Sequence, residues 1–544
     1  MMSEHRTVFL YSNGKSIEFT TKTGQTLLDA LRKVDPTAID SPCGGAGTCG
    51  KCRVRIVSGD AGEVEAEERR LVGNAGLAAG IRLACHVRPL SDISFEKAET
   101  AGAATIHEAF SVLSGTIDPL LKEAGTYGVA VDIGTTTVAA YLVDFSAGEV
   151  LTAASCLNSQ RAWGADVIAR IDHAGKDPAN LAYLADLARK DLSGLANRLL
   201  ASVDASHDAL REISVVGNTT MLHLFAGVDP SGIAVAPFTP AFIALQRKQA
   251  SEYGLPYPKA MVTLGPSVAG YVGADLVAGI RAVGLEERER LSLILDLGTN
   301  GEMALGNKDG IVACATAAGP AFEGAAISCG TGGVAGAIDS LLWNEGRLEW
   351  TTIGDQSPIG VCGSGIIDAA ACLVRGGIAD DTGAFADPWS EEGYPLAGNN
   401  GKSIYFTQGD MRQIQLAKAA VAAGIASMLD DIGAGLDDVE SVFLAGGFGS
   451  YLRPASAAAI GLIPPQLLPK VQAVGNAAGH GAVRMLLFKD EGRDLSSLAT
   501  AVRYLELSGL DFFRDRFVEE LFFPEPVDPV VPAVSTASVS ADTQ

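Results

Sequence analysis

The chain has 544 residues, of which 41 are basic and 64 are acidic, so its formal net charge is −23. This length exceeds what one hydrophobic core organises and predicts at least two or three domains. The acidic excess repels phosphate backbones and argues against nucleic acid as a partner. We expect a cytoplasmic protein, because the sequence shows no apolar run of about 18 residues, no leader peptide and no disulfide-like cysteine spacing.

Residues 1–96 carry the pattern of one small domain. Residues 7–21 alternate in polarity around Asn13–Gly14, which predicts a β-hairpin. The other expected elements are, in chain order, a short amphipathic helix over residues 26–34, a strand and then a helix within residues 51–72, and a returning strand pair within residues 81–96.

Four cysteines of this domain have the spacing of an iron–sulfur site. Cys43, Cys49 and Cys52 form a C-x5-C-x2-C loop, and Cys85 follows later in the chain. Glycines between the first three cysteines allow the backbone to turn around inorganic sulfides. The pattern predicts a [2Fe–2S] cluster. A zinc knuckle or scattered buried thiols are the alternatives, although structural zinc sites usually show two paired C-x2-C halves.

Two segments lack a strand or helix pattern that could add to a core. Residues 97–126 are interpreted as a linker, whose length would let the small domain reach more than one docking position. Residues 524–544 are rich in Pro, Val, Ser and Ala, and we expect them to be a disordered tail.

The body of the chain contains one strand-turn-strand device twice. A buried strand ends at Asp132 and runs into Gly134, Thr135, Thr136 and Thr137. The same device recurs as Asp296, Gly298, Thr299, Asn300, Gly301 and Glu302. In such a turn the N–H groups and hydroxyls can bind phosphate oxygens, and the strand-end carboxylate can hold Mg²⁺ through water. The sequence lacks the G-x-x-x-x-G-K-[ST] phosphate loop. It also shows no G-x-G-x-x-G motif in a convincing strand-to-helix setting for binding a dinucleotide.

The two Asp-x-Gly-Thr hairpins resemble the nucleotide site of the acetate kinase, sugar kinase, Hsp70 and actin superfamily. Residues 215–221 and 476–482 are similar to its two connecting motifs, and residues 442–450 are similar to its adenosine motif, with Gly446, Gly447, Phe448 and Gly449. The resemblance implies two ATPase lobes, which we place at residues 127–290 and 291–523.

Asp275 is the candidate base for activating water, because Gly270–Asp275 matches the G-x-x-D helix start of sugar kinases in that superfamily. Helix capping is the alternative role for this side chain. Two Gly-rich stretches, residues 318–333 and 360–368, are expected to form loops around the same cleft. Their Cys329 and Cys362 are interpreted as buried thiols, although related activators of 2-hydroxyacyl-CoA dehydratases hold a [4Fe–4S] cluster between subunits.

Nearly the whole chain resembles the reductive activators of corrinoid-dependent proteins, with an adrenodoxin-like β-grasp ferredoxin at its N-terminus. Residues 158–171 and 504–508, with Phe523–Pro524, match family segments outside the nucleotide motifs. Ser159 departs from the Pro expected there. No cysteine follows Cys372, which places the chain in the branch with an N-terminal [2Fe–2S] cluster.

The resemblance implies a multidomain protein that uses ATP and Mg²⁺ to return an inactive Co(II) corrinoid protein to Co(I). Cys43, Cys49, Cys52 and Cys85 would hold the electron source, and Asp132 and Asp296 would hold Mg²⁺. Asp275, Glu302 and Asn300 are the candidates for positioning water. An upstream electron donor and a homodimer are also implied. The alternatives are a small-molecule kinase, a donor to another low-potential acceptor, or a redox and nucleotide sensor without turnover.

Overall fold

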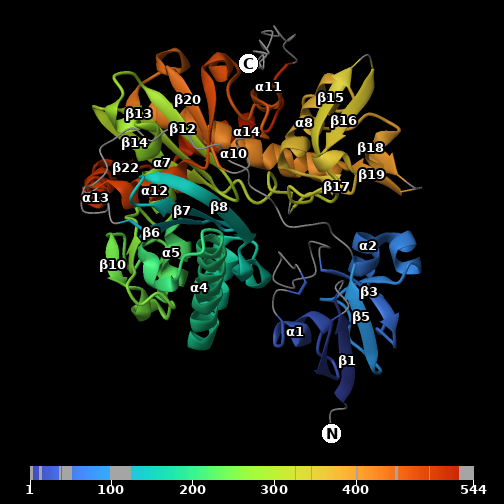
Figure 1. The fold of residues 1–544 in the computed structure, drawn as a ribbon. Coiled ribbons are helices and arrows are strands. Elements are labelled where there is room, and N and C mark those ends of the chain that lie inside the picture. Colours follow the sequence, from blue (N-terminus) through green and yellow to red (C-terminus); the bar gives the residue numbers. More distant parts are fainter. Residues whose placement is uncertain are drawn as a thin grey trace, which may run out of the picture.

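A computed structural model of the chain describes residues 4–11, 15–35, 38–39, 52–98, 124–324, 326–344, 346–399, 402–446, 451–488 and 490–525. Figure 1 shows a small N-terminal domain, in blue, beside a larger body that contains the rest of the chain. No helix among these described ranges is long and apolar enough to cross a membrane.

The N-terminal domain is a five-stranded sheet packed against a short helix. The strand order is β2-β1-β5-β3-β4, and β1 and β5 are parallel. The ring centroids of Phe9 and Phe95 lie 5.1 Å apart in its core. The elements are β1 (Glu4–Leu10), β2 (Ser16–Lys22), α1 (Leu27–Arg32), β3 (Arg53–Ser58), α2 (Ala66–Ala78), β4 (Ile81–Leu83) and β5 (Ile93–Lys97).

This arrangement confirms the expected ferredoxin-like fold and refines one detail of it. The two strands predicted within residues 81–96 do not pair with each other, because β3 lies between them and pairs with both. The turn predicted at Asn13–Gly14 lies outside the described residues, although the strands on either side pair in the expected antiparallel register.

The body contains two six-stranded sheets that share the topology of five strands, which confirms the duplication expected from the sequence. In each sheet three antiparallel strands are extended by two parallel ones, in the orders β8-β7-β6-β9-β11 and β14-β13-β12-β20-β21. One more strand, β10 or β22, completes each sheet. The bounds are β6 (Tyr127–Ile133), β7 (Thr137–Asp144), β8 (Glu149–Leu157), β9 (Leu210–Gly217), β10 (Gln246–Gln249), β11 (Met261–Leu264), β12 (Ser292–Leu297), β13 (Gly301–Asn307), β14 (Gly310–Thr316), β20 (Ser441–Ala445), β21 (Val471–Gly475) and β22 (Arg503–Tyr504).

Two helices, α7 (Ala274–Val283) and α12 (Ala477–Leu487), pack together and contact both sheets. Leu276 and Ile280 of α7 enter the core of the second sheet, whereas Ala278 enters the core of the first. Conversely, α12 comes late in the chain but covers the first sheet, where Ser214 of β9 donates a hydrogen bond to the carbonyl of Ala482. The two lobes are therefore joined by helices that belong to both.

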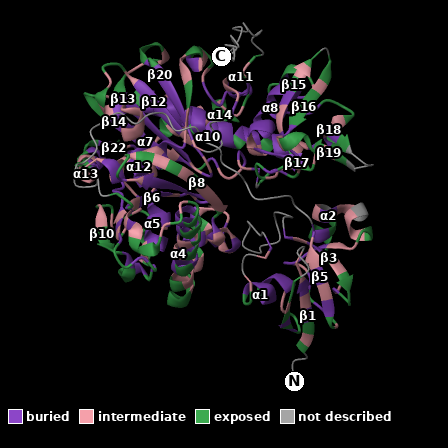
Figure 2. Ribbon diagram, in the orientation of Figure 1, coloured by how far each residue is buried: buried purple, intermediate pink, exposed green. Residues whose placement is uncertain are grey.

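The remaining elements pack around the two sheets or, in the second lobe, form a three-stranded sheet (β16-β15-β17) and a two-stranded sheet (β18-β19) beside them, and Figure 2 shows the central strands and α10 largely in purple, as buried residues. The first lobe carries η2 (Ser159–Trp163), α3 (Val167–Lys176), α4 (Pro178–Ala201), α5 (Thr219–Ala226) and α6 (Ser231–Ala234). The second lobe carries β15 (Ala337–Asn344), β16 (Arg347–Thr352), β17 (Gly360–Val361), α8 (Gly363–Arg375), α9 (Trp389–Glu392), β18 (Tyr394–Asn399), β19 (Lys402–Phe406), α10 (Gln408–Ile432), α11 (Pro454–Ala459), α13 (Glu491–Ala501) and α14 (Asp511–Glu519).

Candidate functional site

Two of the four predicted cluster ligands lie among the described residues, and the fold brings them together. Cys52 precedes β3 and Cys85 follows β4, and their sulfur atoms are 3.2 Å apart in a buried position. Two adjacent thiolates are the donors that an iron–sulfur cluster requires. Cys43 and Cys49 lie outside the described residues, so their placement stays a prediction.

The two Asp-x-Gly-Thr hairpins face each other, as the sequence predicts. The first turn joins β6 to β7 and the second joins β12 to β13, and both turns close on the N–H of their glycine. A Cβ on Gly134 would lie 2.7 Å from the carbonyl oxygen of Thr137, which explains the glycine there. The hydroxyls of Thr136 and Thr299 are 3.4 Å apart, so residues far apart in the sequence meet in one cleft.

Glu323 joins the two turns and was missed by the sequence analysis. The hydroxyls of Thr136 and Thr299 both donate to Oε2 of Glu323, at 2.7 and 2.6 Å. This carboxylate therefore occupies the place between the hairpins where the hydroxyls could bind a phosphate oxygen. Its signal was the Gly-rich stretch 318–333, which was expected to form loops around the cleft, but nothing in the local sequence distinguished this glutamate.

Two asparagines that cap helices hold the first hairpin in place. Asn218 caps α5 and donates to the hydroxyl of Thr135 at 3.1 Å. Asn476 caps α12 and donates to Asp132 at 3.0 Å. Each amide accepts a backbone N–H through its oxygen and uses its nitrogen for the hairpin, so helix capping and site geometry depend on one residue. These are the asparagines of the two connecting motifs.

Three carboxylates lie beside the hairpins, of which Glu302 is buried and Asp275 and Asp296 are half-buried. Burial raises the pKa of Asp275 to about 6. Burial, together with the charges of Asp275 and Glu323, raises the pKa of Asp296 to about 7. The pKa of Glu302 is raised well above its usual value, first by burial and then by the charges of Asp275 and Asp296. Such mutual shifts arise where like charges share an enclosed space, and a cation would relieve them.

Asp275 and Glu302 interact through their side chains, and this interaction lowers the pKa of Asp275 and raises that of Glu302. Asp275 also accepts the N–H of Leu276 at 2.8 Å in the first turn of α7, whose N-cap is Gly273. The side chain thus stabilises the helix start and belongs to the carboxylate group, while its role as the base stays a prediction.

The third strand end of the cleft is that of β20. Gly446 follows this strand with φ +94°, and a Cβ there would lie 2.8 Å from Oδ1 of Asp296. A larger residue would therefore displace the carboxylate of the second hairpin. Gly447, Phe448 and Gly449 lie outside the described residues. Gly301 begins β13, where its carbonyl accepts the hydroxyl of Thr316, and Asn300 closes the turn through its carbonyl.

The donor chemistry of the cleft fits Mg²⁺ bound together with phosphate. No three His, Cys, Asp or Glu side chains form a complete metal cage within the described ranges. Mg²⁺ usually takes one or two carboxylates and completes its shell with water and substrate phosphates. Asp132 and Asp296 end equivalent strands and are the residues that could hold it in this way.

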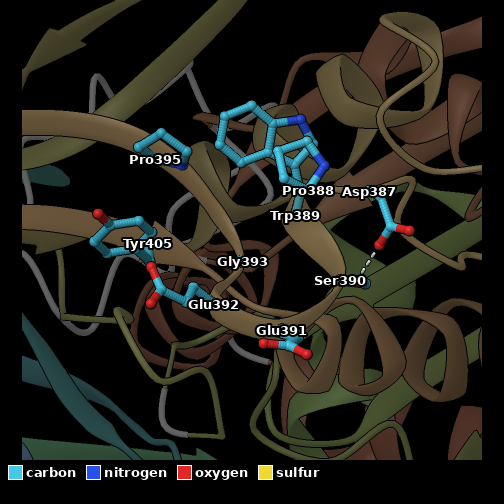
Figure 3. Close-up of a pocket in the computed structure, with 9 residues that line it drawn as sticks. All are labelled: Asp387, Pro388, Trp389, Ser390, Glu391, Glu392, Gly393, Pro395 and Tyr405. Carbon is cyan, nitrogen blue, oxygen red and sulfur yellow. Dashed lines mark hydrogen bonds between the residues drawn. The ribbon is translucent and has the colours of Figure 1, made fainter.

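A second hollow lies apart from these hairpins, on the second lobe. Its volume is about 510 Å³, and none of its lining residues belongs to the predicted site. Figure 3 shows it lined by Trp389, Tyr405 and the carboxylates of Glu391 and Glu392. At its edge the hydroxyl of Ser390 donates a hydrogen bond to Asp387. Cys362 is likewise separate from the cluster ligands and is a buried thiol with a raised pKa, 3.5 Å from the hydroxyl of Ser364.

The fold and the cleft define a class of protein, namely a ferredoxin joined to a kinase-like and actin-like domain. Family comparisons agree with this class. Residues 10–90 match the 2Fe-2S iron-sulfur cluster binding domain, residues 127–288 match the RACo middle region, and residues 290–535 match the C-terminal domain of RACo, the ASKHA domain.

Similarity to individual proteins identifies the family of this chain. The chain is 35% identical over 427 residues to the corrinoid activation enzyme RamQ of Eubacterium limosum, which covers 75% of this chain and 72% of that protein. It is 24% identical to the [Co(II) methylated amine-specific corrinoid protein] reductase of Methanosarcina barkeri, and the match covers 73% of this chain and 77% of that protein. A solved reductive activator for corrinoid, iron-sulfur protein superposes with a TM-score of 0.70 and 31% identity, covering 96% and 98%. The chain belongs to the family of reductive activators of corrinoid proteins.

Proposed function

We propose that this protein is an ATP-dependent reductive activator. One electron passes from its ferredoxin domain to a corrinoid protein, whose inactive Co(II) becomes Co(I), the form that accepts methyl groups. The observation that carries the proposal is the meeting of Thr136 and Thr299 of the duplicated hairpins, in a chain that also brings Cys52 and Cys85 together. Cys43, Cys49, Cys52 and Cys85 hold the cluster, which supplies a single electron when bound.

The hairpins and carboxylates would bind and hydrolyse ATP. The turn hydroxyls and N–H groups would bind phosphate oxygens, and Asp132 and Asp296 would hold Mg²⁺, which would neutralise phosphate charge. Asp275, whose side chain interacts with that of Glu302, accepts a proton from the attacking water. Water adds to the terminal phosphorus as the bond to ADP breaks. Closure of the lobes around nucleotide changes the surface that binds the corrinoid protein. Hydrolysis then releases the corrinoid protein.

The test mixes anaerobically reduced protein with a Co(II) corrinoid protein of the same organism and follows the visible Co(I) absorption. The reaction is run with Mg·ATP, with a non-hydrolysable analogue and without nucleotide. Formation of Co(I) that requires ATP is the expected result. Hydrolysis without any Co(I), for every corrinoid protein tried, would contradict the proposal and favour a donor to another acceptor.

Two variants separate the two halves of the proposed function. Asp275→Asn should abolish ATP-dependent Co(I) formation and leave the cluster spectrum unchanged. Cys85→Ala should remove the cluster spectrum and leave nucleotide binding intact. Cys156→Ala, in β8 of the first lobe, is the matched control for the cysteine change, because its thiol lies outside the ferredoxin domain. If Asp275→Asn retains full activity, Asp275 is not the base.

A further inference from the structure

The ferredoxin domain contacts the first lobe through the end of its helix α1. The side chain of Arg32 is buried, donates a hydrogen bond to the carbonyl of Ala162 and lies over the ring of Trp163, at 5.0 Å from its centroid. Trp163 in turn stacks on His173 of α3 at 4.7 Å. A guanidinium over an aromatic face is a directional contact that lysine does not reproduce. Figure 1 shows α1 turned toward the helices of this lobe.

The same helix is tied to the cluster end of the ferredoxin domain. At the start of α1 the N–H of Leu28 donates to the carbonyl of Ala84 and the N–H of Leu27 donates to Val87, both at 2.9 Å. These two acceptors flank Cys85, a predicted cluster ligand. The position of α1 on the first lobe therefore fixes the position of the cluster-binding segment relative to that lobe.

On the other side of the contact, the Trp163 segment is tied to the first phosphate hairpin. Asn158 caps η2, which ends at Trp163, through a 2.9 Å hydrogen bond from the N–H of Gln160. The backbone N–H of Asn158 donates to the carbonyl of Thr136, and its side-chain nitrogen donates to Gly134, both at 2.8 Å. One residue thus connects the docking segment to two carbonyls of the hairpin turn.

We infer that the Arg32–Trp163 contact is a resting dock for the ferredoxin domain, and that nucleotide bound at the Asp132 hairpin releases it. This inference rests on the nucleotide binding proposed above. The hydroxyls of Thr136 and Thr299 now donate to Glu323, so a phosphate bound there displaces this carboxylate, and in our proposal the turn shifts with it. Because Asn158 holds the turn by its backbone, the rearrangement moves η2 and with it the surface that receives Arg32. The released domain carries its electron to a partner that the docked position does not serve.

Hydrogen exchange of the full-length, cluster-loaded protein tests the inference. Exchange is measured without nucleotide, with ADP and with a non-hydrolysable ATP analogue, and nucleotide binding is measured by calorimetry on the same sample. We expect the ATP analogue to accelerate exchange in residues 27–35 and 159–176. If the analogue binds and exchange there is unchanged or slower, the dock is not nucleotide-controlled, while the proposed function stands. If no nucleotide binds, both fail.

Variants on each side of the contact add a reciprocal test. If nucleotide opens the dock, an open dock must favour nucleotide by the same factor, so Arg32→Ala should tighten binding of the analogue about fivefold. Its exchange in residues 159–176 should be fast without nucleotide. Trp163→Leu should behave in the same way from the other domain. Arg55→Ala, which removes an exposed ion pair with Glu96 in the same ferredoxin sheet, is the matched control.

An intact cluster absorption spectrum shows that the ferredoxin domain of each variant is folded, and a thermal melt like that of the unaltered protein shows the same for the first lobe. Equal nucleotide affinity in Arg32→Ala and the unaltered protein would overturn the coupling, as would a matching change in Arg55→Ala.

Discussion

At the scale of single residues, Asp296 makes the stability of the protein depend on pH. Its pKa is about 7 in the folded chain, against an ordinary value near 4. The folded state therefore binds more protons than the unfolded state between those values, and stability falls as pH rises through this window. We expect Asp296→Asn to raise the free energy of unfolding by about 1–3 kcal/mol at pH 8, and with it the melting temperature. At pH 4 the substitution should change both little.

Thermal melts at several pH values measure this effect. Asp172→Asn, which breaks an exposed ion pair with Lys176, is the control and should give a pH profile parallel to that of the unaltered protein. A parallel profile for Asp296→Asn as well would show that its carboxyl has an ordinary pKa.

Glu323 should compete with nucleotide for the hairpin hydroxyls. The carboxylate accepts from Thr136 and Thr299, and its charge opposes the charge of a phosphate at the same place. Glu323→Gln keeps the shape and removes the charge, so we expect nucleotide to bind roughly fivefold more tightly, or about 1 kcal/mol. Calorimetric titration measures the change. Weaker binding by Glu323→Gln would mean that the carboxylate helps to hold Mg·nucleotide instead.

Sequence reasoning found those site residues whose role is written in a short motif. The duplicated Asp-x-Gly-Thr pattern is visible because each hairpin needs its glycine, hydroxyl and carboxylate within a few positions. Glu323 and the capping role of Asn158 were not visible, since each acts on a turn that is distant in sequence. The raised pKa values of Asp275 and Glu302 depend on burial, which spacing does not reveal.

At the scale of elements, the crossing of α7 and α12 depends on Gly481. A Cβ at this position would lie 2.3 Å from the backbone oxygen of Ala278, a contact with no flexible atom to yield. We expect Gly481→Ala to destabilise the protein by about 1–3 kcal/mol, because the helices must separate. Gly194→Ala is the matched control: it lies inside α4 with open space around it and should stabilise by about 0.5–1 kcal/mol.

Urea denaturation of both variants measures the difference. A stabilised Gly481→Ala variant would show that the two helices do not need their close approach.

Periodicity predicts elements better than it predicts their neighbours. The strand and helix patterns of residues 7–34 are confirmed, because a half-buried strand and an amphipathic helix each repeat within a few residues. The pairing of β4 and β5 with β3 was not predicted, since strand order is a long-range property that local alternation leaves open.

At the scale of the whole molecule, the ferredoxin domain and the first lobe differ in independence. Among the described residues, the ferredoxin core draws on Phe9 to Phe95 alone, whereas the core of the first sheet includes Leu486 and Leu487 of α12. We expect residues 1–98 to fold alone and take up a cluster, and residues 127–290 expressed alone to lack cooperative unfolding. Circular dichroism during heating measures both. Cooperative melting of residues 127–290 would show that α12 is dispensable.

The late arrival of α12 also has a consequence for synthesis. The strands of the first sheet leave the ribosome about 200 residues before the helix that covers them, which is roughly 10–40 s at elongation rates of about 5–20 residues per second. During that interval the apolar face of the first sheet is exposed at Gly128 and Tyr141. These residues lack the contacts that Leu486 and Gly479 of α12 later make with them. The nascent chain is therefore a client for chaperones that bind apolar segments, and slow translation of the second lobe prolongs the exposure.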